Sequence, residues 1–472
     1  MGALARFFSL KGIDFQGDTP PLGTLYKKSI SIAWPAALEG ALLSIIGSFD
    51  MMMVGAIPGR GTESIAAVGL TSQPRMILLI LAQSVCVGTT ALIARRKGEK
   101  NQAEANSVLS QSMYVITLLG VIMTLVGFFG APWLMEVAGA QADTIGPSVA
   151  YFQIISLGFL LNCWSLCLCA AMRGIGMTQI TMVTNIAANL VNVALNYCLI
   201  NGHFGFPALG VRGAAIATVI GTGVSCVIAF WFAMRRDGYL RFTPAFPRFD
   251  RRTLSGLYKV GASSMLEGAS LRLGFFINSR LIANLGTSVF AAYNIVQQAG
   301  VLSYTLGDGI AAAGTALVGQ SLGARRPDLA MANVKIARKL SIITSIVLMI
   351  AIFFTRRPLA LLFTEDESII AAVSMAFLVV IAGMLPQNGR VVYSGCLRGA
   401  GDVKYVAAIS LLSVTIMRPI LTYLFCYPMN RVLPALQLAV TGPWIAFVID
   451  ALVRTSLLER RIARGKWLEI KL

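Results

Sequence analysis

The chain has 472 residues, of which 56% are hydrophobic and 13% are charged, and its formal net charge is +18. Soluble domains carry roughly 25% charged residues, so this composition excludes an ordinary soluble protein and predicts a polytopic, all-α membrane protein. A net charge of this size is also found in nucleic-acid-binding proteins, but the positions of the basic residues argue against that class.

The first half of the chain contains six apolar segments near the length of about 20 residues that crosses a bilayer. The segment before them is polar and contains Pro20 and Pro21. It lacks a short apolar region followed by a small-residue cleavage site, so no signal peptide is predicted. The six predicted spans are 29–56, 63–94, 104–129, 148–171, 179–200 and 210–234.

A basic segment with Pro244 and Pro247 follows the sixth span. It predicts a cytoplasmic linker at 237–253, between an N-terminal lobe at 1–236 and a C-terminal lobe at 254–472 with its tail. The second half again contains six predicted spans, at 254–284, 287–322, 329–355, 368–396, 403–427 and 435–459.

Short motifs of the first half return 225 residues later in the second half. An earlier pair, Leu38–Ala41 and Leu266–Ala269, is offset by 228, and three extra residues near Pro58–Arg60 explain the difference. Six spans return the chain to its starting side, so the repeat is parallel, with a pseudo-two-fold axis along the membrane normal. The recurring motifs are Gly61-Thr62 with Gly286-Thr287, Thr90-Ala91-Leu92 with Thr315-Ala316-Leu317, and Arg173-Gly174 with Arg398-Gly399.

Lysine and arginine are concentrated in the loops on the side of the N-terminus. This distribution follows the positive-inside rule and predicts that both termini are cytoplasmic. The charge therefore sets the topology, and no nucleic-acid partner is expected. The loops of the opposite side, with the adjoining span ends, hold only Arg60, Arg212, Arg356, Arg357 and Arg431.

Charged residues inside membrane spans are costly and usually functional. Glu39 and Asp50 lie eleven residues apart in the first span, which places both carboxylates on one helix face at about 100° per residue. Pro35 in the same span removes a helical hydrogen bond and lets the helix bend. Such a carboxylate can take up a proton, ligate a sodium ion, or only form hydrogen bonds between helices.

Asn192 and Asn196 lie one turn apart in the fifth span, and Thr218 lies in the sixth. Their oxygens and amides could complete an ion site around a carboxylate. The predicted cation-coupling site is therefore Asp50, Glu39, Asn192, Asn196 and Thr218. The predicted coupling ion is H+ or Na+. Sodium bound at Asp50 would be the one metal ion of the protein, and no cofactor is expected.

The second half offers a second polar site. Glu267 is the repeat counterpart of Glu39, while Asn278 stands where Asp50 would be. This group is either a second ion site or a set of buried ion pairs, in which Asp308 pairs with Arg272, Arg390 or Arg418 and only stabilises the fold.

Signatures of enzymes are missing from the sequence. It has no Walker A, HExxH or CxxC motif, and its one histidine, His203, lies in an outward loop. The eight cysteines lie mostly inside spans and are predicted to be small packing residues. A membrane-embedded enzyme or an ATP-driven pump is therefore not predicted.

The repeated GT-x3-AA segment, the TAL segment, the RGxG turn after spans four and ten, and Gly213–Thr218 together resemble the multidrug and toxic compound extrusion (MATE) family over residues 25–460. The resemblance implies a twelve-helix fold of two six-helix lobes that exports drugs by proton or sodium antiport. It also implies that Pro35 and Asp50 match a bent first helix with an essential aspartate. Asn192 and Asn196 would match an Asn-x3-Asp cation pair, with Asn196 in place of the aspartate.

The sequence thus predicts a secondary-active exporter of small organic, cationic amphiphilic compounds. We expect it to act as a monomer in the lipid bilayer of a bacterial inner membrane, driven by protons or, as second choice, by sodium. An exporter of an organic anion or a lipid-linked substrate is the alternative, because Arg272, Arg390 and Arg418 would suit an anion.

Overall fold

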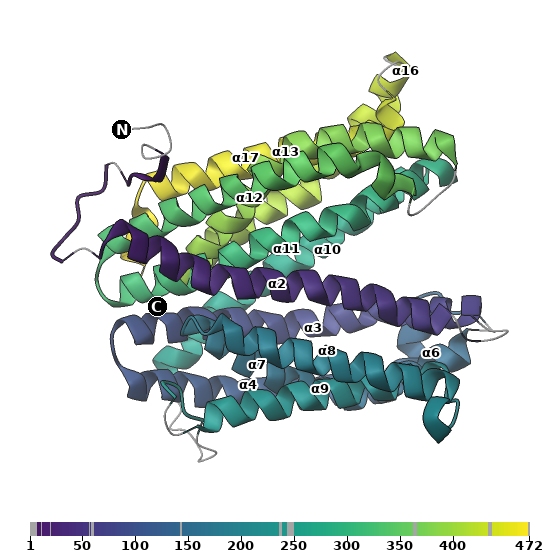
Figure 1. The fold of residues 1–472 in the computed structure, drawn as a ribbon, viewed down its shortest axis with the longest axis horizontal. Coiled ribbons are helices and arrows are strands. Elements are labelled where there is room, and N and C mark those ends of the chain that lie inside the picture. The colour runs from purple at the N-terminus through teal and green to yellow at the C-terminus, as the bar shows by residue number, and fades with distance from the viewer. Residues whose placement is uncertain are drawn as a thin grey trace. The chain divides into compact units, whose positions relative to one another are not determined.

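The computed structural model describes residues 7–10, 12–18, 20–55, 57, 61–141, 144–235, 238–242, 250–361, 366–432 and 437–470. Helices make up most of these residues, and no strand occurs among them (Figure 1). The insertion at Pro58–Arg60 and much of the predicted linker, residues 237 and 243–249, lie outside the described residues.

Each predicted span of the first half corresponds to a helix or a bent helix pair. The fourth span is α6 and α7, which meet at Gly158 with a bend of 49°. A β-carbon at Gly158 would lie 3.0 Å from a methyl group of Val219 on α9, so glycine allows this close packing. The helices are α2 (Leu22–Gly55), α3 (Gly61–Gly98), α4 (Gln102–Phe129), the short α5 (Ala131–Val137), α6 (Ile145–Leu157), α7 (Phe159–Gly174), α8 (Thr178–Asn201) and α9 (Val211–Met234).

The second half repeats this pattern, with one irregular span. In the eleventh span, α-helical turns alternate with π-helical segments at Leu411–Met417 and Phe425–Met429, each of which widens the helix locally. The helices are α10 (Arg251–Ala283), α11 (Thr287–Gly323), α12 (Pro327–Leu361), α13 (Glu367–Ala400), α14 (Val403–Ser410), α15 (Arg418–Leu424), α16 (Asn430–Val432) and α17 (Leu438–Ala463).

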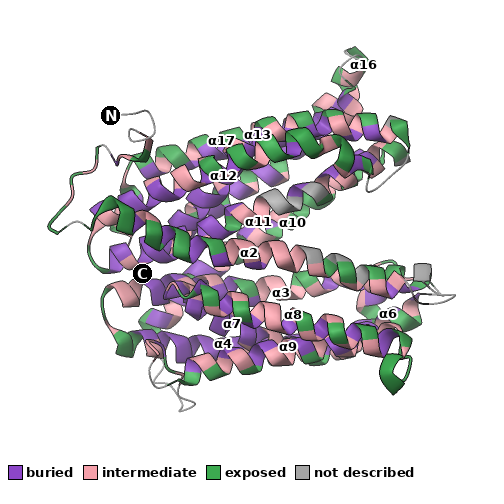
Figure 2. Cartoon of the chain, viewed as in Figure 1, coloured by how far each residue is buried: buried purple, intermediate pink, exposed green. Residues whose placement is uncertain are grey.

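The prediction of a helical membrane protein is confirmed. Within the described ranges, eight segments are long and apolar enough to cross a membrane, and the bent pair α6–α7 makes nine. The remaining spans, α2, α10 and α11, have 34, 33 and 37 residues and the required length. Large apolar side chains such as Leu118, Val227 and Phe354 are exposed on their helices, as expected for surfaces that face lipid (Figure 2).

Packing divides the chain into two compact units, one of Leu38–Met265 and one of Met1–Ala37 with Leu266–Leu472. The predicted lobes 1–236 and 254–472 follow the sequence repeat, whereas the compact units divide inside α2 and α10. These division points, Leu38 and Leu266, are 228 residues apart and therefore equivalent in the repeat. The first turns of α2 thus pack with the second half of the chain.

The helices α2 and α10 each pass from one compact unit to the other. Close backbone contacts hold the first part of each helix in the unit to which that part belongs. A β-carbon at Gly309 of α11 would lie 2.5 Å from the backbone nitrogen of Ala37, so only glycine fits there. The side chains of Ile32 and Ala33 enter the hydrophobic core of the same unit. In α10, Leu257 packs in the same way against Gly88 of α3.

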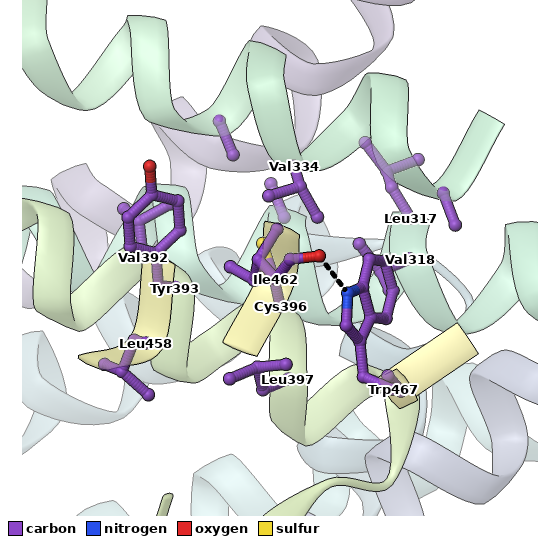
Figure 3. Close-up of a cluster of buried hydrophobic side chains, with 14 of the residues drawn as sticks. Leu317, Val318, Val334, Val392, Tyr393, Cys396, Leu397, Leu458, Ile462 and Trp467 are labelled. Carbon is purple, nitrogen blue, oxygen red and sulfur yellow. Dashed lines mark hydrogen bonds between the residues drawn. The ribbon is translucent and has the colours of Figure 1, made fainter. Parts of the chain in front are cut away.

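Trp467, near the C-terminal end of the chain, belongs to the hydrophobic core of the unit that contains Leu266–Leu472. Trp467 is fully buried against Leu317, Val318 and Leu397, and its indole N–H donates to the carbonyl of Ile462 at 3.0 Å (Figure 3). Residues 464–470, which follow α17, are therefore part of the folded unit.

Replacing Trp467 by alanine should lower the free energy of unfolding by about 3 kcal/mol, because it removes a fully buried ring and leaves a cavity. Thermal unfolding of the purified protein in detergent measures this change. Trp133, which is 64% exposed, supplies the control, and Trp133→Ala should shift the midpoint temperature little. Equal shifts in the two variants would contradict the assignment of Trp467 to the core.

Candidate functional site

The helix α8 presents a row of polar side chains to α2. The amide of Asn185 donates to Glu39 at 2.6 Å, and the hydroxyl of Thr181 donates to the other Glu39 oxygen at 3.0 Å. The amide of Asn196 donates to Asp50 at 2.8 Å. Glu39–Asn185 and Asp50–Asn196 are both separated by 146 residues. The two helices therefore run parallel in a fixed register, and the carboxylates lie about 16 Å apart along them.

Asp50 is the centre of the polar cluster that the sequence predicted. Asn192 lies 3.3 Å from the hydroxyl of Thr218. With its amide nitrogen turned toward the carboxylate, Asn192 donates to both Asp50 oxygens, at 3.0 and 3.1 Å. The structure thus brings together Asp50, Asn192, Asn196 and Thr218. The side-chain oxygen of Asn196 is buried and has no donor among the described residues.

This cluster faces a cavity of about 350 Å³ inside the unit Leu38–Met265. The cavity wall contains one acidic side chain, Asp50, and one basic side chain, Arg75 of α3. Most of the remaining wall is polar and uncharged. A small polar or charged molecule could therefore contact Asp50 directly. Polar wall residues besides these two are Tyr151, Asn162, Ser165, Asn185, Asn189, Asn192, Thr218, Thr222 and Ser225.

Glu39 and its repeat counterpart Glu267 have different partners. Arg398 donates to both oxygens of Glu267, at 2.6 and 3.3 Å, in an ion pair that is almost fully buried on the glutamate side. The counterpart of Arg398 in the first half is Arg173, which forms no ion pair with Glu39 among the described residues. Glu39 is therefore held by neutral donors, and Glu267 is neutralised by a cation.

The counterpart of Asp50 carries no charge. Asn278 accepts a hydrogen bond of 2.7 Å from Thr422, and these two residues are 144 positions apart. A hydrogen bond between the first and fifth spans therefore occurs in both halves. In the second half this hydrogen bond joins Asn278 and Thr422 and involves no carboxylate.

The other residues of the predicted second polar site do not form one cluster. Arg390 donates to Gln387 at 3.1 Å, Arg272 and Asp308 are exposed, and none of these three charged groups has an ion pair in the described part of the chain. The expected pairing of Asp308 with Arg272, Arg390 or Arg418 is therefore wrong. Arg418 pairs instead with Asp450.

Sequence reasoning missed Arg454, which also binds Asp450, at 2.6 Å. The spacing of four residues between Asp450 and Arg454 on α17 could have revealed this contact, because residues four apart are neighbours on a helix. The pairing of Asp450 with Arg418 on another helix left no comparable signal in the sequence.

The described residues include no group of three or more His, Cys, Asp or Glu side chains that could hold a metal ion. The eight cysteines are free thiols, and seven of them are buried. The ring of His203 stacks on Tyr197 with a centroid distance of 4.3 Å.

Known proteins resemble the chain over almost its full length. The MatE family model matches residues 35–198 and 264–424. The chain is 25% identical to "Uncharacterized transporter YisQ" of Bacillus subtilis, over 93% of the chain and 94% of that protein. It is 26% identical to "Probable multidrug resistance protein NorM" of Thermotoga maritima, over 93% of each.

A solved structure shows the same fold. Its title is "Outward-facing conformation of a multidrug resistance MATE family transporter of the MOP superfamily", and the TM-score is 0.85. The sequence identity is 22%, and the match covers 94% of this chain and 97% of the other.

The two equivalent glutamates should respond differently to the same substitution. Glu267→Gln leaves Arg398 without its counter-charge and should lower the free energy of unfolding by about 2 to 3 kcal/mol. Glu39→Gln removes a carboxylate that has only neutral donors and should cost about 1 kcal/mol. Thermal unfolding of both variants tests this difference, and adding Arg398→Gln to Glu267→Gln should restore part of the loss. Equal shifts for the two single variants would contradict it.

Proposed function

The chain belongs to the MATE family, whose model matches more than half of it, and we propose that it exports small organic compounds in exchange for an inward-moving cation. Members of this family are transporters and not enzymes, so the chain is an integral membrane transporter. The observation that carries the finer proposal is the position of Asp50, at the wall of a cavity and among Asn192, Asn196 and Thr218. Protons are the proposed coupling ion, and sodium is the alternative.

One carboxylate at the cavity wall can couple two opposing fluxes. A cationic compound in the cavity would be held by the charge of Asp50. A proton that binds Asp50 removes this charge, and the compound is released. The buried oxygen of Asn196, which has no donor in the described part of the chain, could accept the new hydroxyl. A sodium ion would instead use oxygens of Asp50, Asn196 and Thr218, which are the ligand type that hard cations prefer.

Glu39 has a supporting role in this proposal. It is bound by Thr181 and Asn185 on the same helix whose Asn192 and Asn196 contact Asp50. Its charge therefore fixes the register of α2 against α8, while Asp50 carries the exchange. Pro35 lies four residues before Glu39 and is the proposed point at which α2 bends.

The two sequence halves are proposed to act as lobes that expose the cavity to alternate sides of the membrane, as expected for a parallel repeat. The excess of basic residues in the loops on the same side as the N-terminus supports cytoplasmic termini. The bacterial origin of the relatives supports a bacterial inner membrane. Function as a monomer is proposed as well.

Asp50→Asn should abolish export, because the variant keeps the shape and hydrogen bonds of the site but cannot exchange its charge. Glu39→Gln should retain a measurable fraction of export. Uptake of a fluorescent cation into proteoliposomes, under a proton gradient or a sodium gradient applied alone, measures both the loss and the coupling ion. A matched thermal midpoint shows that the Asp50 variant is folded. Full export by it under either gradient would rule out Asp50 as the coupling residue.

Export of an organic anion is the second candidate function. It is favoured by Arg272 and Arg390, which form no ion pair within the described ranges although both lie well inside membrane-length helices. A lipid-linked substrate would carry the same kind of charge.

A pair of matched cationic and anionic dyes distinguishes the two functions. We expect the cationic dye to bind more tightly, and Asp50→Asn to remove this preference. The double variant Arg272→Gln/Arg390→Gln should leave binding of the cationic dye unchanged. Tighter binding of the anionic dye, lost in the double variant, would favour the second function.

A further inference from the structure

Asp450 is the centre of a buried basic cluster in the unit that contains Leu266–Leu472. One carboxylate oxygen accepts hydrogen bonds from Arg418 and, at 2.6 Å, from Arg454. The other oxygen accepts from the hydroxyl of Ser413. The carboxylate is fully buried, and these donors already surround it.

The π-helical segment Leu411–Met417 builds one side of this cluster. The backbone N–H of Arg418 donates to the carbonyl of Ser413, five residues earlier, so the side chains of both residues reach the same carboxylate. The guanidinium of Arg418 also lies 5.6 Å from the ring centre of Phe275 and 5.1 Å from that of Phe447. These rings fix its position.

Arg454 has more donors than the cluster can satisfy. Its side chain is 2% exposed, and one nitrogen, Nη2, binds Asp450. Its Nε and Nη1 are buried and have no hydrogen-bond partner among the described residues. Unsatisfied donors on a buried cation are strongly unfavourable, so they indicate a group that completes the cluster.

The cluster also has an excess of positive charge. Arg390 of α13 is a third guanidinium in the surroundings of Arg454, and its Nε donates to the neutral Gln387. Asp450 and Asp308 are the nearby carboxylates, because Glu267 is occupied by Arg398. Within the described part of the chain, three guanidinium groups therefore lie near two carboxylates, and one positive charge has no counterpart there.

We propose that this cluster binds a small monovalent anion, of the size of chloride or nitrate, against the free Nε and Nη1 of Arg454 and close to Arg390 and Arg418. The anion supplies the missing charge and accepts the unsatisfied hydrogen bonds. Arg390 is partly exposed, although it lies in the middle of its helix, so this edge of the cluster is accessible. This site does not include Asp50 and does not depend on the export function.

Stability measurements test this site without any transport assay. The purified protein is unfolded thermally in sodium chloride, sodium nitrate or sodium gluconate at equal ionic strength, with gluconate as an anion too large for the site. Chloride or nitrate should raise the midpoint temperature by about 2 °C or more, and the effect should saturate with anion concentration. Equal midpoints in the three salts would overturn the proposal and assign the free donors to water.

Substitutions in the cluster show which residues are responsible for the stabilisation by chloride. Arg454→Gln should remove the dependence on chloride, and Arg390→Gln, at a partly exposed position that tolerates substitution, should weaken it at least tenfold in concentration. Arg272→Gln changes an exposed arginine outside the cluster and should respond to chloride as the unmodified protein does. If Arg454→Gln does not fold, Arg390→Gln decides alone. An unchanged chloride dependence in Arg390→Gln would overturn the assignment.

Discussion

The cost of placing a charge inside a bilayer constrains this structure more than any other single factor. A charged side chain in a membrane span must find compensation or face water. The chain solves this problem in three ways. Glu39 is compensated by neutral donors, Glu267 by one arginine, and Asp450 by two arginines and a serine. The groups that compensate each carboxylate determine how easily that carboxylate can gain a proton or bind another cation.

The repeat makes these solutions comparable, because a constant offset in the sequence pairs the positions of the two halves. Asp50 and Asn278 are both held by a residue of the fifth span of their half, through Asn196 and Thr422. Only the first half keeps a carboxylate there, and only in the first half is the neighbouring glutamate free of an ion pair among the described residues. A carboxylate that is already paired with arginine changes its charge reluctantly, so exchange chemistry is better suited to the first half. The second half holds Glu267 and Asp450 in buried ion pairs with arginine, which favours rigidity.

Much of this arrangement could be predicted from the sequence, because it rests on helix periodicity. Spans follow from apolar length, and the shared face of Glu39 and Asp50 follows from a spacing of eleven residues. The spacing of Asn192 and Asn196 likewise predicted a polar face. Four of the five predicted members, Asp50, Asn192, Asn196 and Thr218, lie together, while Glu39 is bound separately by Thr181 and Asn185. The role of the cluster stays a proposal.

Contacts that depend on irregular geometry could not be predicted. The partner of Arg418 is set by a π-helical turn that brings Ser413 and Arg418 to one carboxylate, and an ideal α-helix would separate their directions. The division of α2 after Ala37 could not be predicted from the sequence either. It depends on close packing of the backbone at Gly309, which a sequence pattern does not reveal.

The register of α2 against α8 links the division of α2 between the two compact units with the geometry around Asp50. Glu39 follows directly after the residue at which α2 passes from one compact unit to the other, and Glu267 occupies the same place in α10. Each glutamate therefore fastens the second part of a crossing helix to its unit, one through Asn185 and the other through Arg398. Because helix α2 is continuous from this point to Asp50, any shift in the bonds of Glu39 displaces Asp50 relative to Asn196. The anchoring of the helix and the geometry of the candidate ion site are thus a single constraint.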